Sequence, residues 1–342
     1  MLSNPTNRFA STTSEQFEDY DPSEDPAPRT QFIPDASATV ITYNDSPDIP
    51  FTASINVYRG CEHGCAYCYA RPTHEFLGFS PGLDFETKIM VKHNAPELLR
   101  TELASPKWKP QCIAMSGVTD CYQPAERKLQ LTRRVLEVLA EFRNPVGIVT
   151  KNHLVTRDVD LLAQLAKFNA AIVYISITTL DAELTPKLEP RASLPKMRLA
   201  AVKTLAEAGV PVGVMLAPMI PGLNDHEMPN ILAAVAEAGA VSAGYVPLRL
   251  PWAVAPLFED WVTRHFPDRK EKVLNRIREM RGGKLNDPNF GSRMSGQGIF
   301  AEQMDKMFEV ACRRAGLPKR EIRLSTAAFR KPPGPQIDLF QV

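Results

Sequence analysis

The feature of this chain that most constrains its fold is a regular alternation of short apolar, β-branched runs with segments of helical periodicity. The last two of the helical segments end in Gly, which helix C-caps favour. Parallel strands joined through helices cross over with a right hand, so the alternation predicts an α/β fold with helices outside a parallel sheet. We expect this sheet to curl into a partial barrel, because six units cannot easily close the eight-fold form. The predicted strands are 53–60, 111–118, 146–151, 170–179, 210–218 and 240–248, and the predicted helices between them include 127–142, 160–168, 194–209 and 228–239.

Composition divides the chain into three parts. Residues 1–50 are rich in Ser, Thr, Pro, Asp and Glu, and such a segment buries too little apolar surface to offset its ordering entropy. We therefore expect a flexible, acidic N-terminal segment at 1–50, followed by the partial barrel at 51–250. At 251–342 the pattern changes to helical segments separated by a Gly-rich loop, which predicts a helical C-terminal extension.

Three cysteines stand close together in the stretch "NVYRGCEHGCAYCYARP", directly after the first predicted strand. Cys61, Cys65 and Cys68 are spaced C-x-x-x-C-x-x-C, and thiolates this close can converge on one metal centre such as an iron–sulfur cluster. A structural zinc site is the alternative, with His63 or His74 as the fourth ligand. Zinc cysteines usually come as paired C-x-x-C knuckles, whereas the remaining cysteines of this chain are scattered singly, so the pattern favours an open three-cysteine cluster.

The N-terminal sequence lacks the basic and apolar regions of a secretory signal and the Arg-rich character of a transit peptide. No run of about eighteen apolar residues is present for a membrane span. We therefore expect a cytoplasmic protein with no membrane partner. In a reducing compartment, clustered cysteines more often hold metal or perform chemistry than form disulfides.

The motif "CEHGCAYC", with an aromatic residue before its third cysteine, resembles the signature of the radical S-adenosylmethionine (SAM) superfamily. More narrowly, the chain is similar from about Pro50 to Leu317 to the spore photoproduct lyase-like, DNA repair photolyase-like branch. Further blocks that look like this branch are "FSPGLDFETKIMVK", "TDCYQPAERKLQLTR", "LEPRASLPKMRLAAV" and "VGVMLAPMIPGLND".

The resemblance implies a six-fold (βα)6 partial barrel, TIM-type, and a 4Fe-4S cluster with three irons held by Cys61, Cys65 and Cys68. The fourth iron is left for the amino and carboxylate groups of SAM. Reductive cleavage of SAM then gives methionine and a 5′-deoxyadenosyl radical that abstracts hydrogen from a substrate, in lyase-like chemistry. A reductant such as flavodoxin or ferredoxin is the implied partner.

Polar residues at the carboxyl ends of barrel strands are the expected cofactor ligands. Ser116, Gly117 and Asp120 lie at the end of the second predicted strand, where this superfamily typically binds the ammonium group of SAM. Asp120 could equally begin a turn. Lys151, which ends the third predicted strand, matches a lysine that spore photoproduct lyases place on the SAM carboxylate; a surface lysine is the alternative.

The resemblance also places Tyr67 beside the adenine and Ser176, on the fourth predicted strand, at the ribose or carboxylate. Ser176 could instead merely pack. Glu189 and Arg191 follow this strand, and the fixed fork of a guanidinium suits carboxylate binding. A helix-capping arrangement around Ser193 is the alternative for these two residues.

The substrate is less constrained than the cofactor. Spore photoproduct lyases use a further cysteine as hydrogen donor, but the corresponding position here falls near Gly117, and Cys121 is the nearest candidate for this catalytic role. This departure puts thymine-dimer repair in doubt.

A net charge of +1 argues against wholesale electrostatic capture of nucleic acid, although residues 259–342 hold more Lys and Arg than Asp and Glu. Three hypotheses follow. The first is a radical enzyme that acts on nucleic acid, the second is one that acts on a protein or small metabolite, and the third is a zinc-binding module without catalysis.

Overall fold

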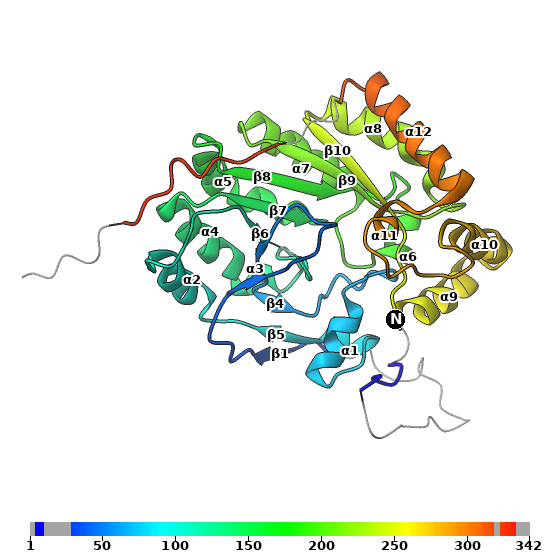
Figure 1. Cartoon of the computed structure of the whole chain (residues 1–342), viewed down its shortest axis with the longest axis horizontal. Helices are drawn as coiled ribbons and strands as arrows, with labels where there is room; N and C mark the ends of the chain where they lie inside the picture. Colours follow the sequence, from blue (N-terminus) through cyan, green and yellow to red (C-terminus); the bar gives the residue numbers. More distant parts are fainter. Residues whose placement is uncertain (1–3, 10–28, 116, 318–321, 333–342) are drawn as a thin grey trace, which may run out of the picture.

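The computed structural model describes residues 4–9, 29–115, 117–317 and 322–332 (Figure 1). In these residues the main sheet has seven strands in the order β10-β9-β8-β7-β6-β3-β2. Neighbouring strands are parallel except β2 and β3, which are antiparallel. The six predicted parallel strands are therefore confirmed, in chain order across the sheet. Their bounds are β2 Ile41–Tyr43, β3 Ala53–Ile55, β6 Ile113–Met115, β7 Val146–Thr150, β8 Ala171–Ser176, β9 Val212–Met219 and β10 Ser242–Pro247.

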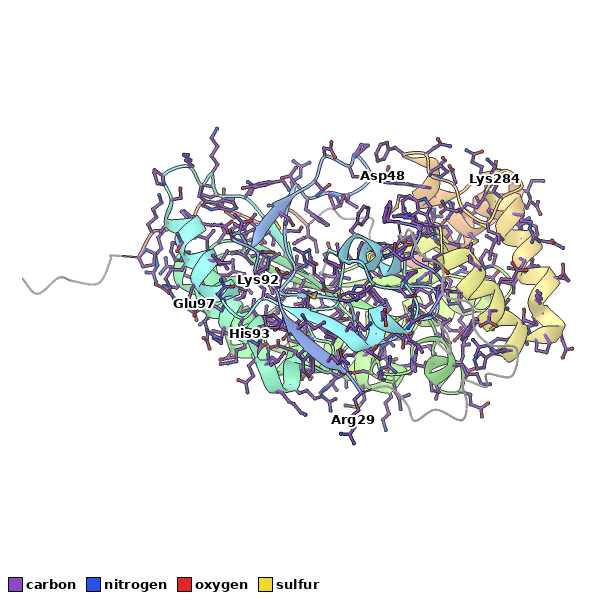
Figure 2. All side chains as sticks on the ribbon, turned by 90° about the horizontal axis from the view of Figure 1, so that it is seen from below. Arg29, Asp48, Lys92, His93, Glu97 and Lys284 are labelled. Carbon is purple, nitrogen blue, oxygen red and sulfur yellow. The ribbon has the colours of Figure 1, made fainter. Side chains whose placement is uncertain are left out.

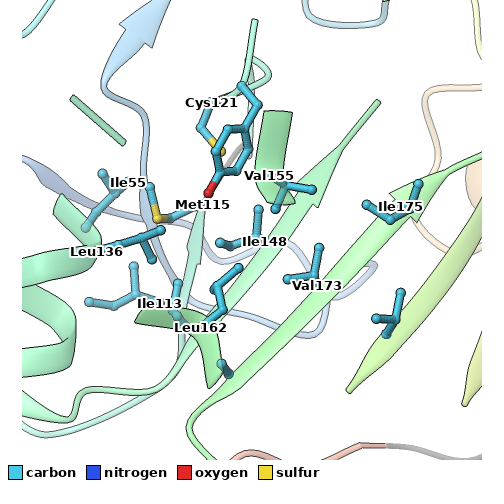
Figure 3. Close-up of a cluster of buried hydrophobic side chains, with 14 of the residues drawn as sticks. Ile55, Ile113, Met115, Cys121, Leu136, Ile148, Val155, Leu162, Val173 and Ile175 are labelled. Carbon is cyan, nitrogen blue, oxygen red and sulfur yellow. The ribbon is translucent and has the colours of Figure 1, made fainter. Parts of the chain in front are cut away.

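Amphipathic helices cover the outside of this sheet, as the periodicity predicts. Each buries one apolar face; on the longest helix between β6 and β7, Val135, Leu136 and Leu139 are fully buried. Figure 3 shows how Leu136 and Leu162 meet side chains of β6, β7 and β8 in the main core. The elements between the parallel strands are α2 Ala95–Ala104, α3 Glu126–Leu129, α4 Leu131–Phe142, η2 His153–Asp158, α5 Val159–Ala166, α6 Leu184–Leu188, α7 Pro195–Glu207, η3 Asp225–Glu227 and α8 Met228–Glu237.

A second, small sheet differs from the sequence prediction. The predicted strand 53–60 is two strands, because the chain leaves the main sheet after β3 and joins β5 (Lys88–Val91) through β4 (Tyr58–Arg59). The third member, β1 (Gln31–Pro34), pairs with β5 in parallel. Residues 29–50 therefore supply two strands, β1 and β2, where we expected a flexible segment. The expectation for residues 10–28 lies outside the described part of the chain.

Helices follow the barrel strands, as predicted for the C-terminal part. The longest, α12, packs against α8 of the barrel and against α10 (Figure 1). A short helix, α11, forms within the Gly-rich segment and lies against β10. None of the helices in the described residues is both long and apolar enough to cross a membrane. The bounds are α9 Val254–His265, η4 Pro267–Arg269, α10 Lys270–Met280, α11 Ser292–Ser295 and α12 Gly298–Arg314.

The segment 4–9 lies against η1 (Arg71–Leu77) and α1 (Leu83–Thr87), the elements that follow the cysteine loop. Arg8 is ion-paired with Glu75 at 3.3 Å. Its guanidinium also stacks on the ring of Trp252, 4.3 Å from the centroid. This segment therefore joins the region after the cysteines to the start of the C-terminal helices.

Candidate active site

The three cysteines lie on the loop between β4 and η1, and their side chains are near enough to influence one another's charge. Cys61 and Cys65 are buried, Cys68 is half-buried, and all three are free thiols. Cys65 and Cys61 belong to separate small apolar clusters, and Cys68 packs against both. Burial raises the pKa of the thiols of Cys65 and Cys68, and the neighbouring cysteines raise it further. Within the described residues, no three His, Cys, Asp or Glu side chains are arranged to hold a single metal ion.

Arg71, three residues after the last cysteine, fixes this loop from inside. Its side chain is fully buried and donates from Nε and Nη2 to the carbonyl oxygen of Cys65, at 3.1 and 2.9 Å. It also donates to two carbonyl groups before α1 and to Glu86, with which it forms an ion pair of 2.6 Å. Because a buried charge is costly unless it is paired and hydrogen-bonded, this set of bonds fixes the path of the loop.

Gly64 lets a second arginine approach the loop. Its φ is +66°, and a Cβ atom there would meet the guanidinium of Arg191 and lie 2.6 Å from Oε2 of Glu86. Arg191 pairs with that carboxylate at 2.5 Å and donates to the carbonyl of Glu62. The guanidinium of Arg191 thus contacts the cysteine loop and Glu86, and its binding to a cofactor carboxylate stays a prediction.

His63 connects the loop to the carboxyl ends of the strands. Its Nδ1 lies 3.4 Å from Oδ2 of Asp120, and its Nε2 lies 3.2 Å from the amide of Asn152. Burial alone would lower the pKa of His63, but Asp120 and Cys61 raise it to about 10. Asp120 also accepts from Thr150 Oγ1 and from the backbone N–H of Lys151, both at 2.8 Å. Asp120 thus contacts both the cysteine loop and the end of β7, and its binding to the SAM ammonium stays a prediction.

Tyr67 and Glu189 contact each other beside the cysteines. The Tyr67 hydroxyl donates to Glu189, which also accepts from Thr178 at 3.1 Å and pairs with the buried Arg198. Burial alone would raise the pKa of Glu189, but Arg198 and Lys151 hold it below its ordinary value. The ammonium of Lys151 lies 5.8 Å from the Tyr67 ring centroid and 3.4 Å from the carbonyl oxygen of Ala217, and its role at the SAM carboxylate stays a prediction.

The remaining predicted site residues lie in different parts of the structure. Ser116 lies outside the described residues. The carbonyl of Gly117 accepts from the Tyr69 hydroxyl at 2.9 Å, so the end of β6 contacts the cysteine loop. Ser176 is buried at the end of β8, and its carbonyl accepts from Arg198 at 2.9 Å. Cys121 lies in the main hydrophobic core near Met115 (Figure 3), in a different cluster from the three cysteines.

Sequence reasoning missed the buried charged residues that bond to the predicted site residues. Arg71 follows the motif directly, in "CYARP", and that position was its available signal. Arg198 lies on α7 and pairs with Glu189, 9 residues before it, whereas Glu86 on α1 pairs with Arg191, 105 residues after it. A charged residue in an otherwise apolar helical face was the signal for Arg198, which is fully buried.

Comparison with known proteins identifies the family. The family model described as the Radical SAM superfamily matches residues 55–235. The chain belongs to the radical SAM superfamily. It is 36% identical over 245 residues to an uncharacterized protein of Mycobacterium tuberculosis, covering 71% of each chain. It is 30% identical over 222 residues to an uncharacterized protein of Methanocaldococcus jannaschii, covering 65% of this chain and 79% of that one.

Solved structures agree on the fold. A spore photoproduct lyase mutant with bound AdoMet and dinucleoside spore photoproduct matches with a TM-score of 0.60 and 15% identity, over 83% of this chain and 78% of that chain. Spore photoproduct lyase complexed with dinucleoside spore photoproduct matches with a TM-score of 0.59 and 15% identity, over 83% and 79%. At this identity the likeness is one of fold.

Membership in the superfamily implies a 4Fe-4S cluster and SAM as cofactors. The residues present fit such a cluster. Three free thiols lie on one loop, with Cys68 packed against the clusters of both Cys61 and Cys65, and cysteine thiolates are the ligands that iron–sulfur clusters use. Arg71 bonds to the backbone of that loop.

Proposed function

We propose that this radical SAM enzyme holds its 4Fe-4S cluster through Cys61, Cys65 and Cys68 and abstracts hydrogen from a nucleic-acid base or lesion. The observation that carries the proposal is the presence of three free, neighbouring thiols on a loop whose backbone is fixed by buried arginine and histidine contacts. Bound there, the cluster supplies the electron that cleaves SAM reductively. A flavodoxin- or ferredoxin-type protein would supply that electron.

The residues around the loop have distinct roles in this proposal. Lys151 neutralises the carboxylate of SAM, because its ammonium faces Tyr67 and the cysteines. Tyr67 offers its ring to the adenine while Glu189 holds its hydroxyl. Gly117 and its neighbours at the end of β6 contribute backbone groups to the cofactor. In this proposal the role of Arg191, Glu189 and Asp120 is to hold the cysteine loop and the strand ends in position.

The nucleic-acid substrate is supported by the fold that this chain shares with a lyase described in complex with a dinucleoside photoproduct. It is also supported by exposed aromatic rings beside the cysteine loop, since bases stack on such rings. The core position of Cys121 does not favour repair of thymine dimers by a cysteine hydrogen donor at this residue. A protein or small-metabolite substrate is the alternative.

Anaerobic reconstitution with iron and sulfide tests the cluster and the chemistry together. The wild-type protein should bind about four irons per chain and, with dithionite, convert SAM to 5′-deoxyadenosine. Cys65→Ala should lose both properties. The matched control is Cys312→Ala, which alters a half-buried free thiol on α12. One colourless metal per chain and no deoxyadenosine from intact wild-type protein would refute the proposal and favour a zinc-binding module.

Candidate substrates separate the two kinds of radical enzyme. Single-stranded and duplex oligonucleotides should stimulate deoxyadenosine formation above the rate without substrate. Their binding should weaken as salt concentration rises, because phosphate contacts release counterions. Stimulation by peptides or metabolites, with no salt-dependent oligonucleotide binding, would favour the alternative.

A further inference from the structure

Arginine side chains gather at the carboxyl end of β10, beyond the cofactor residues discussed above. Arg249 follows this strand, and Arg281 and Arg293 lie near it, from the end of α10 and from α11. Burial lowers the pKa of Arg249, and the charge of Arg293 lowers it further. Burial and Arg249 likewise lower the pKa of Arg281 to about 10. Positive charge is therefore concentrated here, on groups that are partly removed from water.

Two of these arginines have structural partners. Arg281 donates to four backbone carbonyl groups, two at the end of β10 and two in α11, and so fastens the short helix to the strand. Arg293 pairs with Asp48 and donates to Ser46 Oγ at 2.8 Å. Figure 2 shows Asp48 on the same side of the molecule as Lys284, so the segment before β3 reaches the C-terminal helices. Both guanidinium groups are thus committed to holding the fold.

Arg249 lacks such partners. Its Nη1 lies 3.2 Å from the sulfur of Met294, which is a weak acceptor. Its Nε is buried and has no hydrogen-bond partner among the described residues, and no carboxylate of those residues lies within ion-pair distance of it. Asp48 and Asp287 are near enough to influence its charge, but their oxygens bond to other groups. A buried donor on a fixed cation without an acceptor is costly, and an anion would relieve that cost.

Arg249 lies beside the cysteine loop. Leu248 and Leu250, the residues on either side of it, pack in the same apolar cluster as Cys65 and Tyr67. Tyr69 directly follows Cys68, and 52% of its surface is exposed. Trp252, three residues after Arg249, is 67% exposed. An arginine beside exposed aromatic rings is an arrangement that suits a group with both an anionic part and a planar part.

We propose that Arg249 binds a phosphate group of the substrate and that the ring of Tyr69 stacks on an adjacent base, which places the base next to the cluster loop. This inference rests on the proposed function, since it assigns a phosphate-binding residue to a nucleic-acid substrate. Phosphate is favoured over carboxylate because the exposed rings provide a stacking surface for the attached base. Two donor nitrogens of a guanidinium can contact two oxygens of one phosphate.

The test uses the reconstituted, SAM-bound enzyme and the dinucleotide thymidylyl-thymidine, with Kd measured by calorimetry. Arg249→Gln should raise Kd roughly tenfold to a hundredfold, the range for a lost charge-assisted contact, while Arg249→Lys should lose less. The control, Arg100→Gln, removes an exposed arginine that pairs with Glu141 on the outer helices, and its Kd should equal that of the wild type. Equal Kd values for the wild type and Arg249→Gln would overturn the inference.

A second measurement needs no variant and so does not depend on the folding of one. The wild-type enzyme should bind thymidylyl-thymidine at least about tenfold more tightly than its neutral methylphosphonate analogue, which keeps the bases and loses the charge. Equal affinity for the two would overturn the assignment of phosphate. The assignment would also be overturned if Arg249→Gln weakened the binding of N-acetyltyrosine, which carries a carboxylate, and left the binding of the dinucleotide unchanged. An equal loss of SAM affinity in Arg249→Gln would make Arg249 a cofactor ligand and overturn the inference as well.

The outcomes also separate this inference from the proposed function. Dinucleotide binding that depends on Arg249, without any oligonucleotide stimulation of deoxyadenosine formation, would support the phosphate site and refute the proposed substrate. If oligonucleotides stimulate deoxyadenosine formation and Arg249→Gln leaves the Kd for the dinucleotide unchanged, the proposed substrate is supported and the phosphate site is refuted.

Discussion

Replacing Arg71 by Met tests whether the cysteine loop is held by its buried guanidinium. The side chain is fully buried, bonds twice to the Cys65 carbonyl and pairs with Glu86. Removing one partner of a buried ion pair costs about 3 to 5 kcal/mol. Glu86 keeps Arg191 as a second cation, so we expect the lower end, about 3 kcal/mol, or roughly a hundredfold in the folding equilibrium constant.

The assay is anaerobic urea denaturation followed by circular dichroism, together with iron content after reconstitution. Arg71→Met should lower the free energy of unfolding and the amount of iron retained. The control is Arg264→Met, which breaks an exposed pair with Asp260 and should cost about 1 kcal/mol or less. An Arg71→Met loss no larger than that of the control, with full iron retention, would refute the assigned role of this residue.

A double variant examines the physical cause. Arg71→Met combined with Glu86→Leu removes both buried charges, and replacing a buried pair by apolar groups is often close to neutral. The combined loss in the free energy of unfolding should therefore be smaller than the sum of the two single losses. Additive losses would mean that the two side chains are not energetically coupled, contrary to their 2.6 Å ion pair.

Three further predictions use the same unfolding and iron assays. Gly64→Ala should cost about 1 to 2 kcal/mol from its left-handed backbone alone and should reduce iron retention, because the new Cβ meets Arg191; unchanged iron content would contradict this. Tyr67→Phe should cost about 1.5 to 3 kcal/mol, since the buried Glu189 loses a donor, and a loss below 0.5 kcal/mol, on the order of a surface substitution, would show that the hydroxyl is dispensable. Leu136→Ala should cost about 2 to 5 kcal/mol by opening a cavity in the main core, without changing iron per folded chain.

Periodicity predicted the parallel sheet and its covering helices because each of these elements buries one face against its neighbours. The same signal failed for the small sheet. The strand β1 is short, largely exposed and ends in a proline, and its partner β5 lies more than fifty residues away. The predicted strand 53–60 has a continuous pattern, but the chain changes sheets within it, and that change depends on which neighbours are available.

The candidate site likewise has features that the sequence predicts and features that it does not. The cysteines are spaced by a few residues, so their place on one loop could be predicted from the local sequence. The roles of Asp120 and Arg191 are set by His63 and Glu86, which reach them from other parts of the chain. Arg249 belongs to no motif, and its lack of an acceptor is evident only when the side chains around it are placed.

The contact between Arg8 and Trp252 has a consequence for biosynthesis. Trp252 is synthesised 244 residues after Arg8, which at typical translation speeds of 5 to 20 residues per second is a delay of roughly 10 to 50 s. During that interval the indole partner does not yet exist, and Arg8 has only partners that emerge earlier, such as Glu75 and Phe76. Residues 4–9 therefore complete their docking only after all the strands of the main sheet have been made.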